Sequence, residues 1–317
     1  MKKERISMKR ILNLLFLCIT ICFCFTGKVY AAEKDEAEKA AQDFKEYIVA
    51  NDEEYSDWKD ADLEFAYDLY SMDCEKIICK LFYVERAEYK GYVIVDCSDN
   101  TVLEFSLGRP AFDLVNTSEI IEVKYIYENA MPVLLGDGKY YNIYGNGDMI
   151  PISDITPCYY PNEQGNSNCI VAAISNLMWH YGKNGYSSLI NGMTFDGVKN
   201  KVDNLINAEG GYQNKNIPNT IKKYVKNKSS YSVSVTNKWN PTFNNVKTET
   251  NNRPCLLGFA AGKGSYSTSV GHMTVCVGTR TANKINYVKV MDGWSTSITE
   301  KKWGTYNDFI SKVTMSK

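Results

Sequence analysis

The sequence predicts an α+β protein in which two domains follow an amino-terminal leader. Residues 1–31 have the order of a secretory signal peptide. Residues 32–155 show one helical pattern followed by strand patterns, and residues 156–317 show several helical patterns followed mostly by strands. Helices and strands segregated along one unit are typical of the α+β class. The chain of 317 residues is long enough for two domains of ordinary size.

The leader has a basic start, an apolar run and small residues before a cleavage site. Lysine and arginine are concentrated in residues 2–10, and an apolar run follows over residues 11–25. The residues that precede Ala32 then fit cleavage directly after Ala31. An uncleaved membrane anchor is the alternative, but the apolar run is shorter than the ~20 residues of a spanning helix. We therefore expect a secreted protein that has no membrane contact once the leader is removed.

Charge and cysteine content narrow the classes of function. A net charge of −1 gives no electrostatic reason to expect a nucleic-acid partner. Three of the ten cysteines lie in the leader, which leaves an odd number in the exported chain, so at least one thiol stays unpaired within it. The absence of a CxxC pair after the leader and the presence of only two histidines argue against a zinc site. The remaining cysteines are Cys74, Cys79, Cys97, Cys158, Cys169, Cys255 and Cys276.

The first domain is expected to pack one helix on an antiparallel sheet. Apolar residues recur at helical spacing over residues 33–50. Strand patterns follow over residues 76–84, 91–97 and 101–106, and a further hairpin is expected near residues 140–144. No constellation of catalytic residue types is visible in this domain.

The second domain is expected to begin with helices. A proline-rich loop over residues 151–161 leads to a helix that starts close to Cys169 and ends before Gly182. A second helix is expected from an N-cap at Thr194 to Gly210, and a third from Pro218. Strands are predicted over residues 254–259, 272–277 and 286–291, followed by a last short helix that contains Phe309 and Val313.

Cys169 is the candidate nucleophile because it stands where a loop enters the first turn of a helix. The peptide dipoles place partial positive charge at that end, which predicts a lowered thiol pKa and a reactive thiolate. A cysteine thiolate in such a position is suited to covalent catalysis. The alternative is a buried structural cysteine. Cys255 and Cys276 lie inside apolar strand patterns, where burial raises a thiol pKa, so they are weaker candidates.

His272 is the candidate base. His180 lies on the same predicted helix as Cys169, eleven residues further on, and is therefore separated from it by roughly 16 Å along the axis. That separation excludes a hydrogen bond between the two side chains. His272 follows Gly271 and opens a predicted strand. The alternative role for His272 is a core histidine with satisfied hydrogen bonds.

Asp292 and Gln164 complete the candidate site. Asp292 ends the strand after that of His272 and is expected to accept a hydrogen bond from the second imidazole nitrogen. An ordinary Asp-Gly turn is the alternative for this position. The backbone N–H of Cys169 and the side chain of Gln164 are expected to stabilise an oxyanion, with Asn166 and Asn168 as competing donors.

Three segments resemble known peptidases. Residues 169–181 resemble the nucleophile helix of streptopain-type peptidases within the papain-like group. Residues 271–278 and 290–294 are similar to the histidine and acid strands of papain-like and double-glycine-type, bacteriocin-processing-like peptidases. The resemblance covers residues 157–317. It implies that residues 156–317 form a papain-like cysteine peptidase domain, which cleaves peptide bonds without a cofactor and is made as a zymogen.

The resemblance extends to the first domain and also has departures. Residues 90–95 and 102–106 are similar to the propeptide of that family, which implies that residues 32–155 form a pro-domain acting as an intramolecular inhibitor. The family places its oxyanion glutamine six residues before the cysteine, whereas Gln164 precedes Cys169 by five and Glu163 occupies the expected position. Asp292 stands where streptopain-like enzymes use an Asn-Trp segment, which is closer to the double-glycine branch.

The sequence therefore predicts a monomeric, secreted cysteine endopeptidase that hydrolyses protein or peptide substrates through an acyl-enzyme on Cys169. Two alternatives remain open. One is a peptidoglycan endopeptidase or amidase that uses the same residues. The other is a catalytically inactive secreted binding or inhibitor protein built on a peptidase scaffold, which the displaced Gln164 keeps in consideration.

Overall fold

A computed structural model describes most of the chain. The described residues are 36–71, 73–114, 122–128, 131–136, 139–142, 168–259, 272–293, 297–304 and 307–317. The predicted leader, the proline-rich loop, Cys158 and Gln164 lie outside these residues, as does the predicted boundary between residues 155 and 156.

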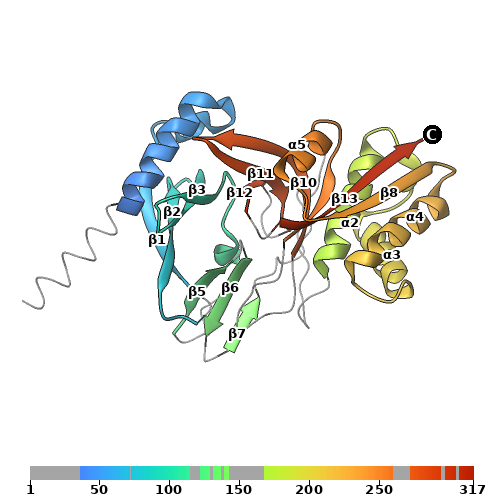
Figure 1. The fold of residues 1–317 in the computed structure, drawn as a ribbon, viewed down its shortest axis with the longest axis horizontal. Helices are drawn as coiled ribbons and strands as arrows, with labels where there is room; N and C mark the ends of the chain where they lie inside the picture. The colour runs from blue at the N-terminus through green and yellow to red at the C-terminus, as the bar shows by residue number, and fades with distance from the viewer. Residues whose placement is uncertain are drawn as a thin grey trace, which may run out of the picture.

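One large mixed sheet of thirteen strands runs through the described part of the chain, in the order β7-β6-β5-β1-β2-β3-β4-β12-β11-β10-β9-β13-β8 (Figure 1). All neighbouring pairs are antiparallel except β1 and β5, which run parallel. A large sheet with several helices is compatible with the predicted α+β class. The strands are β1 (Leu63–Tyr70), β2 (Ile77–Val84), β3 (Gly91–Asp96), β4 (Val102–Ser106), β5 (Lys124–Glu128), β6 (Met131–Gly136), β7 (Lys139–Asn142), β8 (Ser232–Trp239), β9 (Cys255–Phe259), β10 (His272–Ala282), β11 (Ile285–Met291), β12 (Thr299–Lys302) and β13 (Asn307–Ser316).

Four of the five described α-helices begin close to where the sequence predicts them. A helix covers residues 36–51, and four more are α2 (Asn168–Lys183), α3 (Phe195–Ala208), α4 (Ile217–Lys228) and α5 (Phe243–Thr250). Thr194 caps α3 by accepting a hydrogen bond from the N–H of Gly197, which confirms the predicted N-cap. None of the described helices is long and apolar enough to cross a membrane.

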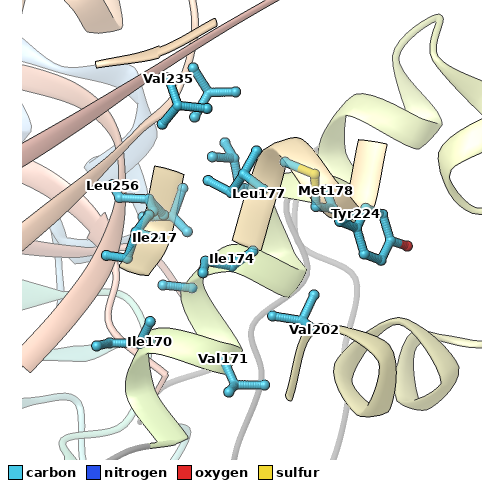
Figure 2. Close-up of a cluster of buried hydrophobic side chains, with 14 of the residues drawn as sticks. Ile170, Val171, Ile174, Leu177, Met178, Val202, Ile217, Tyr224, Val235 and Leu256 are labelled. Atoms are coloured by element: carbon cyan, nitrogen blue, oxygen red, sulfur yellow. The ribbon is translucent and has the colours of Figure 1, made fainter. Parts of the chain in front are cut away.

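Helices α2, α3 and α4 gather at one end of the molecule, away from strands β1–β7 (Figure 1). The inner face of α2 carries Ile170, Ile174 and Leu177, spaced so that all three face the same side. Figure 2 shows these side chains among residues of the neighbouring helices and strands, including Val202 of α3 and Leu256 of β9. Because this face is buried along its length, α2 is fixed against the sheet from its first turn onward.

The helix over residues 36–51 packs on the other part of the sheet. Its Phe44 ring meets the Phe105 ring of β4 edge to face, with centroids 4.7 Å apart, and lies 6.2 Å from the Tyr287 ring of β11. The predicted arrangement of one helix on an antiparallel sheet is therefore present here. Its core, however, includes Tyr287 and Ala282 from the second half of the chain.

The two halves of the chain are joined by the pairing of β4 with β12 and by charges beside it. Glu300 on β12 is buried, and its carboxylate accepts hydrogen bonds from Arg280 and from Tyr55. Arg280 also pairs with Asp52, and the Tyr287 hydroxyl donates to the backbone oxygen of Val102. The junction thus combines backbone pairing, an ion-pair network and aromatic contacts.

The predicted last helix is wrong, because Phe309 and Val313 lie on β13. This strand pairs with β9 on one side and β8 on the other. Positions four apart fall on one face of a helix and also on one face of a strand, so these two residues alone could not decide between the structures. Ser311 and Met315 complete the period-two pattern of buried positions. Strands β1, β5, β6, β8 and β12 and helix α5 were also not predicted.

Candidate active site

Cys169 is the second residue of α2 and is partly buried. Its neighbour Ile170 packs in the same apolar cluster as Met273, the residue that follows His272 on β10. Backbone N–H groups of Met273, Ile170 and Cys169 itself point to the sulfur. The start of α2 and the start of β10 therefore meet at the sulfur, and the use of Cys169 with His272 in one site stays a prediction.

Burial raises the pKa of the Cys169 thiol, and the N–H groups of Met273 and Ile170 oppose this change without reversing it. The sequence predicts the opposite direction from the helix dipole alone. The difference arises because the free energy needed to remove the thiolate from water exceeds the stabilisation that the helix start and its N–H groups provide. In the intact chain the sulfur is therefore held as a neutral thiol.

His272 is the first residue of β10 and is buried, lying opposite Phe259 of β9. Its Nε2 is 2.7 Å from the backbone oxygen of Asp292. A carbonyl oxygen can only accept, so Nε2 must carry the proton in this contact. In the neutral imidazole, Nδ1 is then the nitrogen that carries no proton and is the basic position of the ring.

Burial also lowers the pKa of His272, to about 3. The hydrogen bond to the Asp292 oxygen acts in the opposite direction, while the nearby positive charge of Lys301 lowers the pKa further. At neutral pH both the thiol of Cys169 and the imidazole of His272 are uncharged. This arrangement differs from the thiolate–imidazolium pair expected of an activated cysteine nucleophile.

Asp292 follows β11 directly and is buried. Its carboxylate lies 3.7 Å from the ammonium of Lys301, and its backbone oxygen accepts from His272. The sequence predicts that Asp292 orients His272. The contact seen in the structure is made through the main chain, with the side chain directed to a cation.

Lys301 is a residue of the site that the sequence does not reveal. It belongs to a Thr-Glu-Lys-Lys segment, which has the composition of an exposed turn or edge. Pairing of β12 between β4 and β11 buries it, so that only 1% of its surface is exposed. A pairing between segments almost two hundred residues apart leaves no local signal in the sequence.

His180 does not take part in the site. It lies in the last turn of α2, where Asn184 lies 3.3 Å from its ring. It borders a surface hollow of about 500 Å³ together with Tyr186 and Arg253. The expected role of His180 as a helix-end residue agrees with this position.

The other described cysteines are in less reactive settings. Cys255 and Cys276 are buried and lie directly opposite each other on β9 and β10. Contact with Cys276 and burial raise the pKa of the Cys255 thiol, and burial raises that of Cys79. Among the described residues, no group of three or more histidine, cysteine, aspartate or glutamate side chains is placed to hold a metal ion.

No protein-family model matches the chain, and no curated protein matches its sequence.

Proposed function

We propose that this protein is a secreted cysteine endopeptidase of papain-like type, made as an inactive precursor. The observation that carries the proposal is the position of the Cys169 sulfur beside the start of β10, the strand that His272 opens. The sulfur at the start of α2 lies against the backbone of the residue after His272, and the imidazole is held in one tautomer by the Asp292 oxygen. A cysteine at a helix start beside a histidine of fixed tautomer is the arrangement that acyl transfer requires.

In the proposed mechanism, Nδ1 of His272 takes the proton of the Cys169 thiol as the sulfur attacks a peptide carbonyl. A carbon–sulfur bond forms, and negative charge develops on the carbonyl oxygen. Backbone N–H groups at the start of α2 donate to that oxygen, with Gln164 as the proposed second donor. The proton on Nδ1 then passes to the leaving amine as the carbon–nitrogen bond breaks. Water, activated by Nδ1, hydrolyses the thioester and restores the thiol.

The neutral state of both groups supports a role as a precursor. Burial raises the pKa of Cys169 and lowers that of His272, and both changes disfavour the charged pair. Entry of water or substrate would reduce both desolvation effects. We therefore propose that the chain becomes active only after a rearrangement, for which removal of residues 32–155 is the simplest means.

The junction between the two halves supports such a removal. The catalytic half contributes buried charged groups to it, among them Arg280, Glu300 and Lys301. These groups gain hydration if the first half leaves, so the exposed surface would be polar along β12. A junction made only of apolar residues would leave a surface prone to aggregation.

The test compares the secreted wild-type protein with Cys169→Ala and His272→Ala variants. We expect wild-type protein to shorten itself by cleavage near residues 151–161, to hydrolyse casein, and to react with an epoxide inhibitor at Cys169. Both variants should remain full length and inactive. Processing and casein hydrolysis by Cys169→Ala would contradict the proposal. Release of peptidoglycan fragments without casein hydrolysis would instead identify a cell-wall enzyme.

A further inference from the structure

Lys301 joins the two halves of the chain at the back of the candidate site. It lies directly opposite Glu104 in the pairing of β12 with β4, and its ammonium forms an ion pair with the Glu104 carboxylate. The same ammonium is 3.7 Å from the carboxylate of Asp292. One buried cation therefore contacts one carboxylate from each half of the chain.

The carboxylate of Glu104 is held in place by hydrogen bonds from two buried tyrosines. The hydroxyl of Tyr92 donates to one carboxylate oxygen at 2.5 Å, and the hydroxyl of Tyr127 donates to the other at 2.6 Å. A cavity of about 10 Å³ adjoins Glu104, Asp292 and Lys301, which is close to the smallest space that holds a water molecule. Glu104 thus has several partners, and Lys301 forms ion pairs with both Glu104 and Asp292.

We propose that Lys301 is a positioning residue of the cysteine–histidine site: it holds Asp292 by the carboxylate, so that the backbone oxygen of Asp292 stays against Nε2 of His272. This inference rests on the proposed function, because it assigns His272 as the base. Lys301 acts on the reaction through Asp292 and touches neither substrate nor sulfur in this scheme.

Glu104 makes this positioning dependent on the first half of the chain. In the intact chain Lys301 is shared between Glu104 and Asp292. If residues 32–155 are removed, Glu104 leaves with them, and Asp292 becomes the remaining carboxylate partner of the two. The ion pair with Asp292 then tightens at the moment of activation. Cleavage and site assembly are coupled in this way through a single side chain.

The pKa of His272 responds to burial, to the backbone oxygen of Asp292 and to the charge of Lys301. Further charged and titratable groups surround Lys301 itself: Glu104 of β4, with Tyr92 of β3 and Tyr127 of β5 hydrogen-bonded to it, and Asp292. Lys301 lowers the pKa of His272 by its positive charge. Loss of this charge alone would raise the pKa of His272, whereas loss of the Asp292 hydrogen bond would lower it, so the protonation state of Nε2 is the measurement that reports positioning.

The experiment measures the imidazole directly by NMR of the full-length chain with histidine labelled by ¹³C and ¹⁵N. The background carries Cys169→Ala, which prevents self-cleavage, and His180→Asn, which leaves His272 as the sole labelled residue because the chain has two histidines. We expect Lys301→Met to lose the Nε2–H tautomer signature of His272, because Asp292 is no longer held against that nitrogen. Lys301→Arg should preserve it. An unchanged tautomer signature in folded Lys301→Met protein would overturn the inference.

A second variant keeps the test decisive if Lys301→Met does not fold. Glu104→Gln/Lys301→Met removes both buried charges of the pair and leaves no unpaired Glu104 carboxylate between the strands. It should show the same loss of tautomer signature, and a preserved signature would contradict the proposal. Glu104→Gln alone removes a negative charge and should not raise the pKa of His272.

The peptidase activity of the processed enzyme provides an independent test. Lys301→Met should lower kcat about tenfold, with Lys301→Arg recovering most of the loss, whereas Glu104→Gln should leave the processed enzyme unchanged. Equal kcat for Lys301→Met and wild type would overturn the positioning role. If wild-type protein has no peptidase activity, the proposed function fails, and the NMR result still decides whether Lys301 positions Asp292 and His272.

Discussion

Nε2 of His272 donates its hydrogen bond to the main-chain oxygen of Asp292, at 2.7 Å. The residue that orients the imidazole therefore does so with an atom that every amino acid possesses. Asp292→Asn should retain this acceptor and lower kcat/KM by no more than about tenfold, whereas His272→Ala should lower it by about 10³-fold or more. Steady-state kinetics on the processed enzyme checks this. Equal losses in the two folded variants would show that the carboxylate itself is required.

The buried imidazole should make stability depend on pH. The pKa of His272 is about 3 in the folded chain and ordinarily 6.5, so unfolding takes up a proton between these values. His272 therefore opposes folding increasingly as the pH falls from 6.5 towards 3, by up to about 1.4 kcal/mol per pH unit. In a Cys169→Ala background, urea unfolding at pH 7 and pH 5 should show this loss. His272→Gln should reduce the loss, whereas the control His180→Gln should not.

Gly91 is a position where a side chain should not be tolerated. Its φ is +148°, and an added Cβ would lie 2.3 Å from the backbone oxygen of Ser106 and 2.7 Å from the Trp58 ring. Gly91→Ala should destabilise the chain by about 2–4 kcal/mol. Gly197→Ala is the matched control, because that glycine lies in the first turn of α3 with only ordinary contacts, and alanine favours a helix. Thermal or urea unfolding measures the stability of both variants. Similar stability of Gly91→Ala and Gly197→Ala would contradict the close approach of Gly91 to Ser106 and Trp58.

Arg280 should be the most sensitive charged residue of the junction between the halves. Its guanidinium contacts Asp52, Glu54 and Glu300, and Glu300 is only 1% exposed. Arg280→Met removes the guanidinium partner of the buried Glu300 carboxylate. It should lower the free energy of unfolding by about 3–5 kcal/mol. Lys238→Met, at an exposed position of β8, should cost less than about 0.5 kcal/mol. A small loss for Arg280→Met at pH 7 would show that the network contributes little.

Local patterns were sufficient to predict much of the second half of the chain. The N-cap at Thr194 and the start of α2 beside Cys169 depend on residues within a few positions of each other, and the structure places them as expected. The choice of His272 over His180 as the partner of Cys169 rests on the helix rise and stays a prediction. The sequence placed Cys169 at a helix start and His272 at a strand start, and both elements begin there in the structure.

What could not be predicted depends on distant pairing. The direction of the Cys169 pKa change follows from burial, which the helix dipole argument does not include. The partners of Lys301 follow from the pairing of β12 with β4, and a short polar segment gives no sign of it. Phe309 and Val313 were assigned to a helix because their spacing fits both periods, and only the pairing of β13 with β9 and β8 separates them.

The place of β13 has a consequence for synthesis of the protein. This strand comes after the other described strands in the chain, yet it lies between β9 and β8, which are not neighbours in the described sheet. A nascent chain whose residues 307–316 are still within the ribosome or a translocation channel leaves two open strand edges at that point. That part of the sheet must close after translation of these residues, so early termination just before them should yield aggregating rather than merely weakened protein.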